Sequence, residues 1–261
     1  MITISSAAVT HPGLVRKSNE DSMLVTDQLA AVADGLGGHA AGEVASKIAV
    51  ERMARLAEQQ SFNPDDVISA IADANQLILS EARRRPEYLG MGTTLCGVGV
   101  VQVGGSGHCV VFNVGDSRVY RYVDGLLSQV TVDHSEVEEL RAAGQISAQD
   151  MARHPRRNVV TRCLGSEPSP LPDLWVFPPT ERERFLICSD GLTGEVDDAA
   201  IGEVLGSHAD PGPAASALLE LALAAGGRDN IAVIVVDLAN SAAAGSIDAD
   251  TAPRTRSTQS P

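Results

Sequence analysis

Six acidic residues share a position in the sequence that could support metal chemistry. Each lies beside a turn or at the end of a segment that we expect to be a strand; the six are Glu20, Asp21, Asp34, Asp116, Asp190 and Asp229. If the strand ends meet at one edge of the fold, these carboxylates form a concentrated anionic pocket, in which like charges repel one another. Divalent cations would neutralise such a pocket.

The residue types of this pocket favour hard cations. Carboxylate oxygens suit Mg²⁺ or Mn²⁺, and no cysteine or histidine cluster has the spacing of a zinc site. Two such ions that share a carboxylate activate a water and bind phosphoryl oxygens, an arrangement typical of phosphate-ester hydrolysis. The glycines after Asp34 and Asp190 would let the backbone approach the ions closely.

Asp-Gly pairs are also common turn signals, so a single pair does not indicate a metal site. Asp124-Gly125 lies between two strand-like segments, and we expect it to be a plain hairpin turn. Asp34 and Asp190 differ, because each follows a buried apolar segment and precedes an apolar or Gly-rich one.

The elements that must position these residues follow from the hydrophobic periodicity. Strand-like segments are expected at residues 2–9, 22–26 and 29–33, across 93–132, at 183–192 and at 231–238, and helices at 41–60, 64–85, 136–143, 198–205 and 213–225. Each apolar sheet face needs a covering layer. The pattern therefore predicts an α+β fold: a four-layer α-β-β-α sandwich of two antiparallel sheets flanked by helices.

Composition excludes several classes of protein. The 261 residues carry a net charge of −14 and only 3% aromatic side chains, which argues against non-specific nucleic-acid binding. No run approaches the roughly 18 apolar residues of a membrane span, and no secretory signal is present. The four cysteines are far apart and are expected to be reduced core residues. We therefore expect a soluble, cytoplasmic protein with no membrane partner.

One catalytic domain is expected over residues 1–239, with a long polar excursion, a flap, at about 133–165. Residues 240–261 are rich in Ala, Ser, Thr and Pro and are expected to be a disordered tail. No coiled-coil pattern or apolar surface stripe is evident, so we expect a monomer. Trp175 is expected to pack in the core.

Seven short motifs occur in an order that resembles a known family. They are GLVRKSNED (13–21), ADGLGGH (33–39), MGTTL (91–95), NVGDSRVYR (113–121), DHS (133–135), CSDGL (188–192) and DNIAVIVV (229–236). In this order they resemble the bacterial branch of the metal-dependent PP2C (PPM) protein phosphatases, over nearly the whole chain. The family fold, a β-sandwich flanked by helices, agrees with the layers predicted above.

The resemblance implies a set of metal ligands. Asp34 would bridge two ions, with Asp190 and Asp229 completing the first site and Glu20 and the Gly35 carbonyl serving the second. Asp116, together with Asp190, would form a third and weaker site, which gives two or three Mn²⁺ or Mg²⁺ ions per chain. Asp21 would support the ligands without binding an ion directly.

The resemblance also implies catalytic roles. Arg16 would bind the substrate phosphate through its planar guanidinium fork, and His39 would protonate the leaving serine or threonine oxygen. A solvated surface residue is the alternative for both. The flap would lie beside the active site, where Arg153, Arg156 and Arg157 could attract phosphopeptides or simply be solvated. Thr93 and Thr94 are given no chemical role, because a strand start explains them equally well.

The function that these features predict is hydrolysis of phosphoserine and phosphothreonine on proteins by a hydroxide that bridges two metals. Cys188 and Ser189 lack an accompanying base, so no covalent phosphoenzyme is expected. The resemblance implies phosphorylated proteins as substrates and an opposing bacterial Ser/Thr kinase of the Hanks type. Two alternatives stay open: a hydrolase of small phosphorylated metabolites on the same metal site, and a non-enzymatic phosphopeptide-binding regulatory module.

Overall fold

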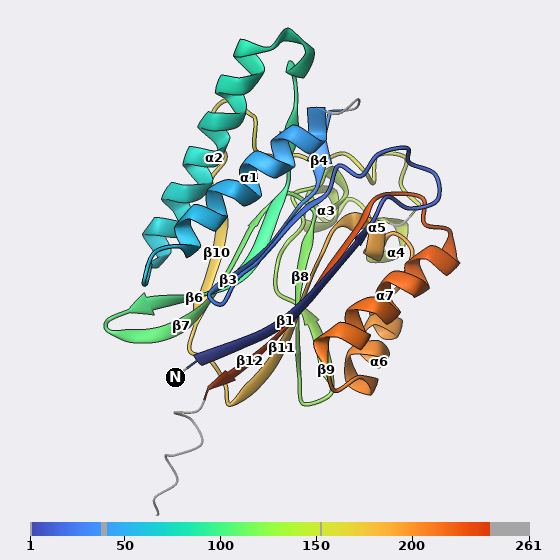
Figure 1. Cartoon of the computed structure of the whole chain (residues 1–261). Helices are drawn as coiled ribbons and strands as arrows, with labels where there is room; N and C mark the ends of the chain where they lie inside the picture. The colour runs from blue at the N-terminus through green and yellow to red at the C-terminus, as the bar shows by residue number, and fades with distance from the viewer. Residues whose placement is uncertain (1, 38–40, 152, 241–261) are drawn as a thin grey trace, which may run out of the picture.

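The computed structural model describes residues 2–37, 41–151 and 153–240, and it contains two five-stranded antiparallel sheets (Figure 1). Sheet A consists, in spatial order, of β1 (Ile2–His11), β12 (Ile231–Asn240), β11 (Arg182–Cys188), β8 (Arg118–Val123) and β9 (Leu126–Gln129). Sheet B consists of β10 (Asp173–Phe177), β7 (Ser106–Val114), β6 (Leu95–Val103), β3 (Leu29–Ala33) and β2 (Ser22–Val25). A two-stranded sheet pairs β4 (Gly35–Leu36) with β5 (Gly92–Thr93).

Helices cover both outer faces, so the predicted four-layer sandwich is confirmed. Two helices, α1 (Ala41–Ala57) and α2 (Pro64–Arg84), lie on sheet B; two others, α6 (Asp198–Ser207) and α7 (Pro211–Ala225), lie on sheet A (Figure 1). Strand β3 shows the consequence. Its residues are all buried, because Leu29, Ala31 and Ala33 face the helices while Ala30 and Val32 face sheet A. No helix of the described residues is long and apolar enough to cross a membrane.

The start of α2 is encoded locally. Asn63 accepts hydrogen bonds from the backbone N–H groups of Asp65 and Asp66, and Asp66 accepts one from the N–H of Asn63. This capping box, followed by Pro64 in the first turn, satisfies amide groups that the helix itself cannot pair.

Two of the expected strands were predicted too long. The strand expected at 183–192 ends at Cys188, and α5 (Asp190–Thr193) follows after Ser189, which is the N-cap residue of this helix. The strand expected to reach Val132 ends at Gln129. Asp124-Gly125 does form the expected hairpin turn, with φ values of +52° and +80°.

Strand β10 was not predicted, because prolines surround its short apolar run. Trp175 lies in this strand and packs against the core between the sheets, as expected. Cys96, Cys109 and Cys188 are buried free thiols, and Cys163 is half-buried. β12 extends to Asn240, and the remainder of the predicted tail lies outside the described residues.

The flap contains α3 (Glu136–Ala142) and α4 (Ala148–Met151). Its two ends are joined by a bridge between Ser135 and Val160, so the excursion leaves and re-enters the domain at one place.

A buried ion pair of sheet A also contacts sheet B. Arg121 of β8 donates a 2.6 Å hydrogen bond to Glu183 of β11, whose side chain has no exposed surface. Glu183 also accepts from the backbone N–H of Thr180 and from the thiol of Cys109 in β7. The Arg121 guanidinium lies over the ring of Phe177 in β10. Loss of one charged partner would leave the other buried and uncompensated.

We expect Arg121→Met to lower the free energy of unfolding by about 3 kcal/mol, because it leaves the buried Glu183 carboxylate without its positively charged partner. The double variant with Glu183→Gln should recover part of that loss, since Gln is neutral and can still accept from Thr180. Urea unfolding of both variants tests this expectation. A double variant at least as unstable as the single one would contradict it.

Candidate active site

The six acidic residues meet at one end of the sandwich. β3 ends before Asp34, β7 before Asp116 and β11 before Asp190, whereas β2 begins after Asp21 and β12 after Asp229. Antiparallel pairing places these ends together: Ser22 pairs with Ala33, and Cys188 pairs with both Arg118 and Val233. The topology therefore gathers the acidic loops near α5 and β4 (Figure 1).

A cavity of about 460 Å³ opens among these loops. Its lining contains every proposed ligand and the proposed phosphate-binding residue, namely Arg16, Glu20, Asp34, Gly35, Asp116, Asp190 and Asp229. His39 lies outside the described residues. The structure also adds residues that the sequence did not single out, among them Lys17, Asn158, Val160 and Asn230.

Two threonines hold the backbone of Asp34. The hydroxyl of Thr94 accepts from the Asp34 N–H at 2.9 Å, and the hydroxyl of Thr93 donates to the Asp34 carbonyl at 2.8 Å. Thr94 also hydrogen-bonds to Ser117, next to Asp116, at 2.7 Å. This role could not be predicted from the sequence, because the partners are about sixty residues apart in the chain.

Asn230 holds the loop that carries Arg16 and Glu20. Its amide nitrogen donates to the carbonyls of Pro12 and Ser18, and its amide oxygen accepts from the N–H of Glu20 at 2.8 Å. Asn230 is buried, so each of these groups would otherwise lack a partner. This residue, too, was not singled out from the sequence.

The glycines after Asp34 and Asp190 are required for backbone packing. A Cβ on Gly191 would collide with the carbonyl oxygen of Asn230. One on Gly35 would collide with the backbone of Gly42 and lie 2.7 Å from the carbonyl oxygen of Glu20. Both positions allow loops from different strands to touch.

Mutual repulsion and burial raise the proton affinity of the carboxylates. Burial, followed by the charges of Asp21, Asp190 and Asp116, raises the pKa of Asp34 well above its ordinary value. Burial and nearby carboxylates raise the pKa of Asp21 and that of Asp116 to about 7. Asp21 accepts a 2.8 Å hydrogen bond from Ser189, which limits the rise in its pKa.

Arg16 supplies positive charge at the rim of the cavity. Its guanidinium donates a 2.7 Å hydrogen bond to Asp229, and that contact raises the pKa of Arg16. The Arg16 side chain is 58% exposed, so much of the fork faces solvent. Such a group can bind an anion in the cavity.

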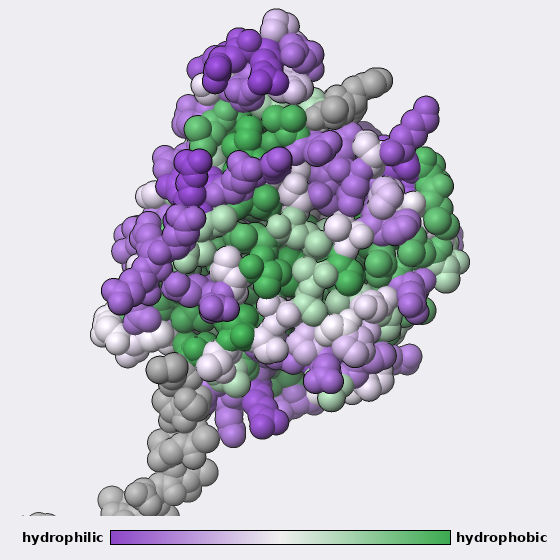
Figure 2. Space-filling model, viewed as in Figure 1, coloured by the Kyte–Doolittle hydropathy of each residue, from purple (hydrophilic) through white to green (hydrophobic). Residues whose placement is uncertain are grey.

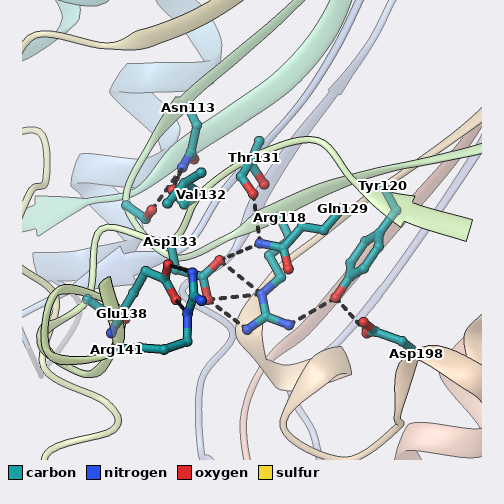
Figure 3. Close-up of polar contacts among 12 residues, drawn as sticks. Asn113, Arg118, Tyr120, Gln129, Thr131, Val132, Asp133, Glu138, Arg141 and Asp198 are labelled. Atoms are coloured by element: carbon teal, nitrogen blue, oxygen red, sulfur yellow. Dashed lines mark hydrogen bonds and ion pairs between the residues drawn. The ribbon is translucent and has the colours of Figure 1, made fainter. Parts of the chain in front are cut away.

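Arg118 connects the start of the flap to the cavity wall. Its guanidinium forms a forked contact with Asp133, and another of its nitrogens donates to the hydroxyl of Tyr120 at 2.9 Å (Figure 3). Tyr120 in turn donates to Asp198 at the start of α6. The network therefore connects β8 to the flap and to the helix layer. It is centred on Arg118, which lies two residues after Asp116 in the chain.

His134 holds the backbone beside Asp116. Its N–H donates to the Gly115 carbonyl at 2.9 Å, and its Nδ1 accepts from the Gly115 N–H at 3.0 Å. Nδ1 must therefore be unprotonated, and Nε2 carries the hydrogen that faces Asp173 at 3.2 Å. Burial lowers the pKa of His134, in agreement with a neutral ring.

The chemistry of the cavity fits hard divalent cations. Its donors are carboxylate and carbonyl oxygens, and Asp21 has a buried Oδ1 with no hydrogen-bond partner. Among the residues described, no three side chains stand ready to bind one ion. The Asp229 carboxylate is already engaged, because it accepts a hydrogen bond from the Arg16 guanidinium at 2.7 Å and one from the Asn230 N–H at 2.9 Å.

The fold and the cavity thus define a class of protein: a four-layer α-β-β-α sandwich with an oxygen-rich acidic site at one end of both sheets. The sequence profile described as protein phosphatase 2C matches residues 16–217. The chain belongs to this family.

Individual relatives support the assignment of the chain to this family. The serine/threonine protein phosphatase PstP of Mycobacterium tuberculosis is 36% identical over 242 residues, which cover 91% of this chain. The serine/threonine phosphatase Stp of Listeria innocua is 35% identical over 87% of the chain and 93% of its own length. The chain spans 45% of the length of the mycobacterial relative.

Solved structures show the same architecture. A crystal structure of the mycobacterial PstP phosphatase superposes with a TM-score of 0.83 at 36% identity and covers 91% of this chain and 100% of its own. The catalytic domain of PstP in complex with two manganese ions also gives a TM-score of 0.83, at 34% identity, covering 92% of this chain and 100% of its own.

In metal-free protein, Asp34→Asn should raise the free energy of unfolding by about 1 kcal/mol or more at about pH 7.5. The reason is that the raised pKa of Asp34 records a cost of ionising it in the folded state, and this cost grows as the pH rises above the ordinary aspartate value. The gain should shrink towards about pH 5, because the cost of ionising Asp34 falls as the pH approaches the ordinary aspartate value. Urea unfolding in EDTA measures it, with Asp124→Asn in the exposed turn as the control. Equal stability of wild type and Asp34→Asn at both pH values would refute the expectation.

His134→Ala should destabilise the protein by about 2 kcal/mol near neutral pH, because the buried Gly115 N–H loses its acceptor. A lowered histidine pKa means that the contribution is complete above the unfolded value of about 6.5 and is lost as the pH falls through the folded value. The stability gap between wild type and variant should therefore narrow on acidification. Urea unfolding across this pH range, with His108→Ala as control, measures how the stability gap changes. A gap that widens on acidification would contradict the prediction.

Proposed function

We propose that this chain hydrolyses phosphoserine and phosphothreonine on proteins with the help of Mn²⁺ or Mg²⁺. The single observation that carries the proposal is the cavity in which Asp34, Asp190 and Asp229 face the same space as Arg16. Membership of the protein phosphatase 2C family and the two manganese ions in the PstP catalytic domain support it. Residues 1–239 would form the catalytic domain.

We assign the metal ligands as the sequence suggested. Asp34, Asp190 and Asp229 would hold one ion, Asp34 with the Gly35 carbonyl and Glu20 would serve a second, and Asp116 with Asp190 would serve a third. When bound, divalent ions supply an activated water and neutralise the charge of the phosphate. Because the carboxylates repel one another in their absence, the same ions would also relieve the strain recorded in the raised pKa values.

The protein's own groups bind and orient the phosphate. Arg16 keeps one guanidinium nitrogen on Asp229, which directs the rest of the fork towards the cavity. Because its loop is held by Asn230, the guanidinium is placed before substrate arrives. Thr93 and Thr94 fix Asp34 through its backbone, leaving both of its carboxylate oxygens for other partners. His39 would act as the general acid.

The wider setting is part of the same proposal. Substrates would be phosphorylated proteins, in the cytoplasm, and an opposing Ser/Thr kinase of the Hanks type would generate them. The enzyme would act as a monomer. Arg157 of the flap, in a second pocket that shares Asp116, Asn158 and Asp190 with the cavity, lies where it can attract a phosphopeptide.

The decisive experiment measures phosphate release from a phosphothreonine peptide with Mn²⁺ and with EDTA. We expect metal-dependent turnover that Asp34→Asn lowers by at least roughly a hundredfold, because that carboxylate would bridge the ions. Arg16→Lys should lower kcat/KM roughly tenfold or more, since an ammonium group cannot donate two parallel hydrogen bonds. Asp124→Asn, in the exposed hairpin turn, should retain full activity.

Turnover of sugar phosphates but not of the peptide would instead support a metabolite phosphatase on the same site. Binding of the phosphopeptide without turnover under any divalent ion, by a folded protein, would support the regulatory module. Either result would overturn the proposed function.

A further inference from the structure

Two aliphatic side chains are exposed immediately before Arg16. Leu14 and Val15 each leave 66% of their surface accessible to solvent. Among the large hydrophobic residues that the structure describes as exposed, they are the only two adjacent in sequence. An exposed apolar pair beside a phosphate-binding residue calls for a partner, whereas a single exposed leucine elsewhere would not.

The loop that presents them is fixed. Leu14 donates its N–H to the Gly227 carbonyl at 2.7 Å, and Asn230 holds the carbonyls of Pro12 and Ser18 on either side. Gly13 has a φ of +79°, and any side chain there would collide with the carbonyl oxygens of Asp229 and Gly227. The two side chains therefore protrude from a rigid support, which reduces the entropy lost when they bind a ligand.

Leu14 lies near a further apolar side chain, and the chain enters the cavity lining directly after the pair. A Cβ on Gly227 would lie 3.2 Å from Leu14 and 3.1 Å from Leu223 of α7, so these two leucines adjoin the same glycine. Figure 2 shows apolar surface at the right edge of the molecule, where Figure 1 places the loop after β1 and the end of α7. On the other side of Arg16 the chain enters the cavity lining directly, at Lys17 and Ser18.

We propose that Leu14 and Val15 form a subsite for an apolar side chain that flanks the phosphorylated residue of the substrate. The inference rests on the proposed function and adds a sequence preference to it. The pair directly precedes Arg16 in an anchored loop, so the residues that flank a phosphate bound by Arg16 would pass close to it. Burial of an aliphatic side chain against them would favour that peptide over a polar one.

The test compares phosphothreonine peptides that carry a single leucine, at each of the three positions on either side, with peptides that carry serine at the same position. We expect wild type to prefer leucine in at least one position by about fivefold in kcat/KM. The double variant Leu14→Asn, Val15→Thr should reduce that ratio to about one. The ratio is internal to each enzyme, so a general loss of activity cancels. Leu126→Asn, an exposed leucine of β9, should keep the preference.

The outcomes separate the subsite from the function. Equal turnover of all peptides by wild type, or an unchanged preference in the double variant, would overturn the subsite and leave the phosphatase standing. No turnover of any phosphopeptide by the folded enzyme would overturn the function and the subsite together. A dimer in sedimentation that the double variant abolishes, with selectivity unchanged, would assign the surface to a second copy of the chain and also overturn the proposal.

Discussion

Repulsion among carboxylates is the constraint around which this end of the molecule is built. Several acidic groups share one cavity, and burial together with the charges of neighbouring carboxylates raises the pKa of Asp21, Asp34 and Asp116. The groups that hold them are mostly neutral and act on the backbone: Thr93 and Thr94 on Asp34, Asn230 on the loop of Glu20, His134 on Gly115. These contacts involve backbone groups, so they do not depend on whether a carboxylate is protonated.

The antiparallel topology makes this possible. In such sheets the loops alternate between the two ends, so acidic residues placed after β3, β7 and β11 and before β2 and β12 must meet. The buried carboxylates at this end of the sandwich lower the stability of the folded protein. Three buried apolar layers, together with the Arg121–Glu183 pair between the sheets, stabilise the fold and offset this loss. The residues of the proposed site and the residues that stabilise the fold thus lie in different parts of the same domain.

The sequence predicted the layers and the acidic cavity because both depend on local patterns. Apolar periodicity marks the elements, and an aspartate at a strand end is visible without knowledge of its neighbours. The supports of the site were missed for the opposite reason: Thr94, Asn230 and His134 act on partners 60, 210 and 19 residues away. The short strand β10 was missed because prolines surround it, and the helix α5 was missed because it is only four residues long and directly follows an apolar strand.

One loop carries both the proposed phosphate-binding residue and the exposed apolar surface beside it. Asn230 and Gly227 anchor the chain between Pro12 and Ser18, and this anchored stretch contains both Arg16 and the exposed pair Leu14 and Val15. A guanidinium recognises a phosphate and not the chain to which the phosphate belongs. Discrimination between phosphoproteins must therefore come from contacts next to it. Rigid side chains lose little entropy on binding. A loop that holds Arg16 in place for the proposed catalysis can therefore also recognise the substrate residue next to the phosphorylated one.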